Sequence, residues 1–186
     1  MKIIKTTFKD LLIVKQKNNY DKRGSLREVF NNKILKVNNF VFEYCTTSKA
    51  NALRGFHFQY KFQQAKYVNV LKGKILDCVI DLRKNSKTFG KSFKIILSDK
   101  NCLSLFIPKG FAHAYYSFEK TNIVYYKLTN YYKPNFESGI NLLDENLKIR
   151  WPKKIAKFQR RIKIFNHLKI FVKFINFYSQ ISLFQL

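Results

Sequence analysis

Residues 66–82, KYVNVLKGKILDCVIDL, carry the strongest structural signal in the chain. Two runs rich in β-branched and apolar residues flank Lys72-Gly73, a dipeptide typical of a tight turn, so the stretch predicts a pair of neighbouring strands. Shorter runs of the same kind follow at 92–97, 102–107 and 123–128. Strands of about six residues at spacings of roughly 8–12 are typical of antiparallel sandwiches and barrels. We therefore predict an all-β fold of jelly-roll type.

The distribution of acidic residues divides the chain. Its 186 residues suit one domain with at most an appendage. All eleven Asp and Glu lie at or before Glu145, whereas the residues after it include ten Lys and Arg. We place a domain at 1–152 and a separate segment at 153–186. Apolar residues in this segment recur every three or four positions between basic ones, which predicts a basic amphipathic helix. The helix would dock on the domain or a partner, or lie on an anionic membrane surface; the third alternative is a segment that folds poorly.

The formal net charge of +25 predicts attraction to anions. Charge alone does not distinguish nucleic acid, anionic lipid and a phosphorylated metabolite. No recognised nucleic-acid-binding motif accompanies the charge, so we expect no nucleic-acid partner. A composition rich in Lys, Ile, Asn and Phe is also what an AT-rich genome encodes, and this alternative needs no functional explanation of the charge.

Cysteine usage and hydropathy predict a cytoplasmic protein. The three cysteines form no CxxC pair and are odd in number, which favours reduced thiols. The first residues carry charges every few positions and lack the apolar run of a signal peptide. Nowhere do 18 uncharged apolar residues run together, so no transmembrane helix is predicted.

Two of the three histidines indicate a site for proton transfer. His57 and His113 stand beside glycines, in what we interpret as turns of the β domain, and the chain has no His-x-His pair of the kind common in metal sites, so no metal is predicted. Removing a proton next to a carbonyl needs a base, a cation at the enolate oxygen and, for inversion, an acid on the opposite face. His57, Lys66 and Tyr126 supply these three types. Tyr125 and Tyr126 point to opposite faces of one predicted strand, and the sequence does not decide which faces the interior.

Six motifs follow one another with nearly ungapped spacing over roughly residues 18–152. They are Asp21-Lys-Arg-Gly24, Leu53-Arg-Gly-Phe-His-Phe-Gln59, Asp81-Leu-Arg83 with Ser86-Lys-Thr-Phe-Gly90, Ile107-Pro-Lys-Gly-Phe-Ala-His113, Tyr126-Lys-Leu-Thr-Asn-Tyr-Tyr132 and Ile149-Arg-Trp-Pro152. In this order they resemble the dTDP-4-dehydrorhamnose 3,5-epimerase family. The resemblance implies a cupin-type jelly roll, a homodimer without metal or organic cofactor, and epimerisation of a nucleotide-linked 4-keto-6-deoxyhexose at C3 and C5 for polysaccharide synthesis.

The same resemblance assigns roles to single residues. His57 would be the general base, Tyr126 the acid on the opposite face, and Lys66 the cation that stabilises the enolate. The remaining matched residues would contact the substrate: Arg54 at the diphosphate, His113 in the sugar pocket, Arg23 and Glu28 at the nucleotide, often across the dimer interface, and Gln59, Tyr132 and Glu137 elsewhere in the site.

Asp81 is our own candidate for a carboxylate that orients a histidine, since a base needs its tautomer fixed. The alternative is that this aspartate, at the end of a predicted strand, holds Arg83.

Two departures from the family pattern affect the expected function. The usual Gln-Asp-Asn before the RGxH motif is Phe42-Glu-Tyr44 here, and Leu26 replaces an aromatic residue, so the nucleotide and sugar preferences stay open. After Pro152 the chain lacks the Ser-x-Lys-Asp motif whose Asp supports the catalytic histidine in the family; a shifted reading frame would produce this loss. The alternatives to a 3,5-epimerase are therefore a catalytically impaired sugar-nucleotide binder and an enzyme that inverts C3 alone.

Overall fold

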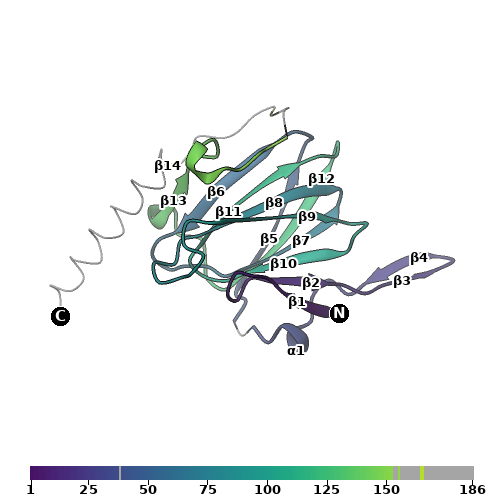
Figure 1. Cartoon of the computed structure of the whole chain (residues 1–186). Helices are drawn as coiled ribbons and strands as arrows, with labels where there is room; N and C mark the ends of the chain where they lie inside the picture. The colour runs from purple at the N-terminus through teal and green to yellow at the C-terminus, as the bar shows by residue number, and fades with distance from the viewer. Residues whose placement is uncertain (38, 153–154, 156–163, 166–186) are drawn as a thin grey trace.

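The computed structural model describes residues 1–37, 39–152, 155 and 164–165 and consists mainly of two facing six-stranded sheets (Figure 1). In spatial order, the first sheet contains β1 (Lys2–Lys5), β2 (Leu12–Lys15), β10 (Leu103–Ile107), β7 (Lys66–Lys72), β12 (Asn122–Leu128) and β5 (Phe42–Ser48). The second contains β14 (Ile164–Phe165), β13 (Glu137–Ile140), β6 (Leu53–Gln59), β11 (Phe111–Ser117), β8 (Lys74–Asp81) and β9 (Ser92–Ser98). All pairs are antiparallel except β13 with β14. The predicted all-β class is confirmed, and the five strands predicted from apolar runs are β7 to β10 and β12.

A hairpin, a short helix and two 3₁₀ turns complete the described fold. The hairpin of β3 (Asn18–Asp21) and β4 (Gly24–Arg27) extends away from the two sheets (Figure 1). The short helix α1 (Asn32–Leu35) begins after Asn31, whose side chain accepts a hydrogen bond from the backbone N–H of Lys33. The 3₁₀ turns η1 (Pro134–Phe136) and η2 (Glu145–Leu147) flank β13.

Alternation along the strands separates the interior of the sandwich from its outer faces. The cluster between the sheets takes every second residue of the central strands, such as Val68 and Val70 of β7 and Val124 and Leu128 of β12. The intervening residues of β11 and β8 face outwards and pack under the segment that ends at Trp151. The outer face of the first sheet is covered by residues around α1. Side chains at interior positions therefore either fill the core or, where the sandwich opens, line a pocket.

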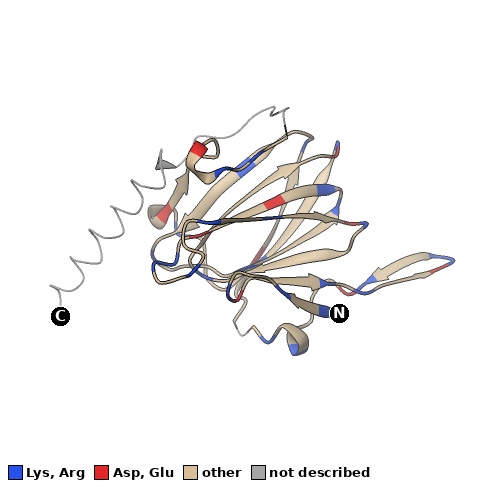
Figure 2. Ribbon diagram, in the orientation of Figure 1, with Lys and Arg blue, Asp and Glu red and all other residues tan. Residues whose placement is uncertain are grey.

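The segment predicted to be a basic helix falls almost entirely outside the described residues. Only 155 and 164–165 of the range 153–186 are described, and 164–165 form β14. The amphipathic-helix prediction and its three alternatives therefore lie outside the described structure. Figure 2 shows the basic residues of the described part spread over the hairpin, α1 and the turns of both sheets. Among the helices described, none is long and apolar enough to cross a membrane.

Candidate active site

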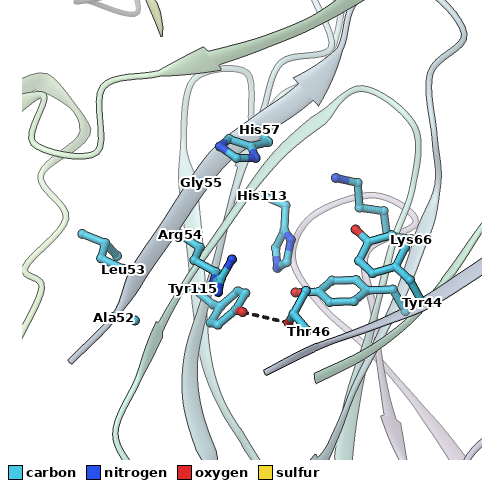
Figure 3. Close-up of a pocket in the computed structure, with 11 residues that line it drawn as sticks. Tyr44, Thr46, Ala52, Leu53, Arg54, Gly55, His57, Lys66, His113 and Tyr115 are labelled. Carbon is cyan, nitrogen blue, oxygen red and sulfur yellow. Dashed lines mark hydrogen bonds between the residues drawn. The ribbon is translucent and has the colours of Figure 1, made fainter. Parts of the chain in front are cut away.

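A cavity of about 450 Å³ lies between the two sheets. Residues from the first sheet and from the second line opposite walls, and their side chains converge in Figure 3. The lining residues are Tyr44, Thr46, Ala52, Leu53, Arg54, Gly55, His57, Lys66, His113, Tyr115 and Tyr126. Five of the residues predicted from sequence, namely Arg54, His57, Lys66, His113 and Tyr126, thus share one cavity.

Strand parity explains why these polar side chains face the interior. Lys66 has the same parity as the core residues of β7, and Tyr126 lies between two core residues of β12. His113 likewise lies between Phe111 and Tyr115 of β11, which both belong to the inner cluster. Polar side chains therefore interrupt the apolar interior stripes of three strands, and all three of them line the cavity. This geometry also decides between the two adjacent tyrosines: Tyr126 faces the pocket.

A bulge in β6 brings two further residues onto the same wall. Arg54 pairs with Tyr115 and His57 with His113, so three steps along β6 correspond to two along β11. Residues three apart normally point to opposite faces of a strand, and the extra residue corrects this difference. Gly55 occupies the bulge with a φ of +111°, and a Cβ there would lie 2.4 Å from the backbone oxygen of His113. Only glycine permits this close approach. Both histidines therefore lie on paired strands, and the prediction that they stand in turns was wrong.

His57 lies at the mouth of the cavity, with 42% of its side chain exposed. Its Nδ1 is 3.5 Å from Oε1 of Glu137 on β13. The pKa of His57 is lowered to about 4, first by desolvation and then by electrostatic interactions with Lys66, His113 and Arg54. The imidazole is therefore neutral at pH 7 and can accept a proton.

Lys66 and Tyr126 are buried in the first sheet. Burial lowers the pKa of Lys66 to about 8, against the attraction of Glu137 and Asp77, so the ammonium is still mostly protonated at pH 7. Burial raises the pKa of Tyr126 well above its usual value, although a hydrogen bond with Thr46 acts in the opposite direction. The pocket thus holds a neutral imidazole, a cation and a protonated phenol.

A different carboxylate from the predicted one pairs with a histidine. Asp77 of β8 is fully buried, and its Oδ2 lies 2.8 Å from Nε2 of His113. Asp81 serves the alternative role: its carboxylate accepts hydrogen bonds from Arg83, Ser86 and Thr88. The orienting role proposed for Asp81 was therefore wrong, because those three donors already occupy its oxygens.

Hydrogen bonds fix Arg54 relative to the floor of the pocket. Its Nε donates to Oγ of Ser48 at 2.9 Å, and Ser48 in turn lies 2.9 Å from the hydroxyl of Tyr115. The Tyr115 hydroxyl also lies 2.9 Å from Oγ1 of Thr46, as the dashed line in Figure 3 shows. The guanidinium is held at the cavity wall, where its remaining donors suit an anionic group.

Comparison with known proteins agrees with this geometry. The family model described as dTDP-4-dehydrorhamnose 3,5-epimerase matches residues 5–167. The chain belongs to this family. The dTDP-4-dehydrorhamnose 3,5-epimerase of Methanothermobacter thermautotrophicus is 39% identical over 155 residues, which cover 81% of this chain and 84% of the relative. That of Salmonella typhimurium is 39% identical over 158 residues, covering 82% and 86%.

Solved structures of the family have the same fold. The dTDP-6-deoxy-D-glucose-3,5-epimerase of Legionella pneumophila, in complex with dTDP-4-keto-L-rhamnose, superposes with a TM-score of 0.81 at 36% identity, covering 85% of this chain and 87% of that one. The Bacillus anthracis dTDP-4-dehydrorhamnose 3,5-epimerase, with TDP and PPi bound, gives a TM-score of 0.79 at 34% identity, covering 89% and 94%.

The other residues matched to the dTDP-4-dehydrorhamnose 3,5-epimerase family lie around or away from the cavity. Gln59 is buried and bonds to the backbone of Phe62, Tyr131 and Lys133. Tyr132 is exposed, and its hydroxyl donates to Glu137 at 2.7 Å. Arg23 lies in the extended β3–β4 hairpin with 90% of its side chain exposed, and Glu28 follows that hairpin and bonds to Asn31.

The two substituted positions in the matched motifs lie in the described part of the structure, whereas the stretch after Pro152, where the Ser-x-Lys-Asp motif is missing, lies almost entirely outside it. Tyr44 lines the cavity and stacks on Tyr126, with ring centroids 4.8 Å apart and planes at 25°. Leu26 lies on β4 and is 69% exposed.

Sequence reasoning missed Asp77, Thr46 and Tyr115. The signal for Asp77 was available, because a single carboxylate inside the apolar run 75–80 must be buried with a partner. The hydroxyl groups of the other two residues gave no such signal.

Proposed function

We propose that this protein epimerises a dTDP-linked 4-keto-6-deoxyhexose at C3 and C5. Its family membership and the convergence of His57, Lys66 and Tyr126 on one cavity support this proposal. The observation that carries it is the placement of His57 and Tyr126 on different sheets, β6 and β12, with the cavity between them. A sugar ring in that space would have a base on one face and an acid on the other.

The proposed reaction has two steps at each carbon. His57 removes the proton from the carbon next to the C4 ketone; the electron pair of the broken C–H bond forms the enolate, whose oxygen is stabilised by the Lys66 ammonium. Tyr126 then gives its phenolic proton to the opposite face of the same carbon, and the carbonyl forms again with inverted configuration. The ketone acidifies both neighbouring C–H bonds. Between the two inversions His57 releases its proton to solvent and Tyr126 takes one up from solvent, so the same base and acid serve C3 and C5 in turn.

The charge states at neutral pH suit these roles. With a pKa of about 4, His57 is an unprotonated imidazole, whereas Lys66, with a pKa of about 8, is mostly an ammonium. The raised pKa of Tyr126 keeps its phenol protonated until the enolate takes the proton. Arg54 would bind the diphosphate, because its planar guanidinium can donate two parallel hydrogen bonds to phosphate oxygens.

The test is solvent exchange. The protein is incubated in D₂O with dTDP-4-keto-6-deoxy-D-glucose, and deuterium at C3 and C5 is followed by NMR and mass spectrometry. We expect incorporation at both carbons and its complete loss in His57→Ala. No incorporation by the folded protein would reject the enzyme in favour of a sugar-nucleotide binder. Incorporation at C3 alone would identify the narrower epimerase.

The proposal extends to a cytoplasmic homodimer. The β3–β4 hairpin carries the exposed Tyr20 and Leu26 and extends away from the sheets of its own chain (Figure 1). In a dimer, Arg23 and Glu28 could reach the nucleotide in the partner's cavity. Sedimentation equilibrium measures the oligomeric state, and a monomer would remove this part of the proposal. Deuterium exchange by a protein truncated near Pro152 tests whether residues 153–186 contribute to activity.

A further inference from the structure

Three neighbouring side chains disfavour a positive charge on His57. Arg54 of β6, Lys66 of β7 and His113 of β11 each lower its pKa. A base that removes a proton becomes an imidazolium, and these three groups oppose that charge. Proton abstraction at this site therefore needs a nearby anion to stabilise the imidazolium and to fix the tautomer of the ring.

The chain offers few candidates for that anion. All eleven acidic side chains of the printed sequence lie within the described residues. Among these eleven described side chains, only Glu137 places a carboxylate oxygen within 4 Å of a ring nitrogen of His57. Asp77 is engaged by His113, and Asp81 by Arg83, Ser86 and Thr88. The acidic residue cannot come from positions 146–186, because that stretch contains no Asp or Glu.

Glu137 is placed and held for such a role. On β13 it pairs with Gln59 of β6. Gln59 is two residues from His57, so the side chains of Glu137 and His57 lie on the same face of neighbouring strands. Its side chain is 13% exposed. The Tyr132 hydroxyl donates to Oε2 at 2.7 Å and leaves Oε1 directed at Nδ1 of His57, 3.5 Å away. This separation is long for a hydrogen bond, and such contacts commonly tighten when substrate binds.

We propose that Glu137, held by Tyr132, is the positioning residue that orients His57 and stabilises its protonated form. The inference rests on the proposed function and replaces the expectation that Glu137 contacts substrate. With Nδ1–H donating to the carboxylate, Nε2 becomes the nitrogen that accepts the substrate proton. Glu137 thus takes the place of the carboxylate that the absent Ser-x-Lys-Asp motif would supply.

The experiment compares Glu137→Gln and Glu137→Leu with the unmodified protein and with Glu119→Gln, a control that removes an exposed carboxylate from the β11–β12 turn. We expect deuterium exchange at saturating substrate to fall about 10–100-fold in both Glu137 variants, more in the leucine variant, with dTDP affinity by calorimetry unchanged. Tyr132→Phe should show a smaller loss of deuterium exchange than either Glu137 variant. Glu119→Gln should match the unmodified protein. Equal losses in exchange and in dTDP affinity would overturn the inference, because they would identify Glu137 as a substrate contact.

Two further readouts separate positioning from a general structural effect. In ¹⁵N-histidine spectra, His57 should be the Nδ1–H tautomer in the unmodified protein and a tautomer mixture in Glu137→Leu; an unchanged ring signal would contradict the inference even if the protein showed no epimerase activity. Glu137 also raises the pKa of Lys66, so the alkaline decline of exchange should move to lower pH in both Glu137 variants. If the alkaline decline did not move, the Glu137 carboxylate would not carry its charge close to Lys66 and His57, which would contradict the inference.

Discussion

The buried ammonium of Lys66 should make the protein less stable than it could be. Lys66 is 9% exposed, and desolvation lowers its pKa from an ordinary value of 10.5 to about 8. A shift of one pH unit corresponds to about 1.4 kcal/mol, so keeping this lysine charged in the folded state at pH 7 costs about 3 kcal/mol. Replacing it with methionine, which has a similar length and no charge, removes that cost.

The pH dependence has a definite sign. Below pH 8 the lysine is charged in both the folded and the unfolded chain, so the full cost is present. Between about 8 and 10.5 the folded protein has released the proton and the unfolded chain still binds it, so this group makes stability rise with pH, by up to about 1.4 kcal/mol per pH unit. Above 10.5 both states are neutral and the contribution is constant.

Urea unfolding at a fixed protein concentration, at pH 7 and at intervals from pH 8 to 10.5, measures both effects. We expect Lys66→Met to be more stable than the unmodified protein by about 3 kcal/mol at pH 7, to lose the rise with pH, and to lose deuterium exchange by at least about 10²-fold. Lys72→Met, which removes an exposed lysine at the end of the same strand, is the control and should change neither. A less stable Lys66→Met with an unchanged pH profile would refute the reasoning.

Three further predictions follow from the geometry. Tyr126→Phe should retain deuterium exchange while losing inversion, because abstraction and reprotonation use different groups; Tyr125→Phe, on the opposite face, is the control, and equal loss of both NMR signals in Tyr126→Phe would contradict the assignment. Gly55→Ala should cost about 2–4 kcal/mol in urea unfolding, since the added Cβ meets the Ala114 backbone at 2.5 Å and φ is positive; an unchanged midpoint would show that β6 and β11 can separate freely. Asp81→Asn should lower stability by about 1–2 kcal/mol at pH 7, allowing for solvent screening, because hydrogen bonds from Arg83, Ser86 and Thr88 outweigh burial and hold the pKa of Asp81 at about 2. That contribution is present above the unfolded value near 3.8 and disappears as pH falls through the folded pKa, so the two proteins should converge in unfolding experiments near pH 2.

The strands were predictable from sequence where composition alone identifies them. The run 66–82 and the segments that became β9, β10 and β12 are dense in β-branched and apolar residues between turn formers. The strands β6 and β11 were missed because glycine and histidine gave their beginnings the composition of turns. In the structure, Gly55 forms a bulge within a strand, and that distinction depends on the neighbouring backbone of β11.

The sequence by itself determined the all-β class and the chemical groups available for proton transfer, His57, Lys66 and Tyr126, because residue type and local pattern suffice for both. Only the tertiary structure decided that Tyr126 rather than Tyr125 faces the cavity, and that Asp77 and Glu137 rather than Asp81 lie beside the histidines. These choices depend on sheet register and on a bulge between strands more than fifty positions apart in the chain. Contacts across such separations are fixed by pairing and packing, which no local stretch of sequence encodes.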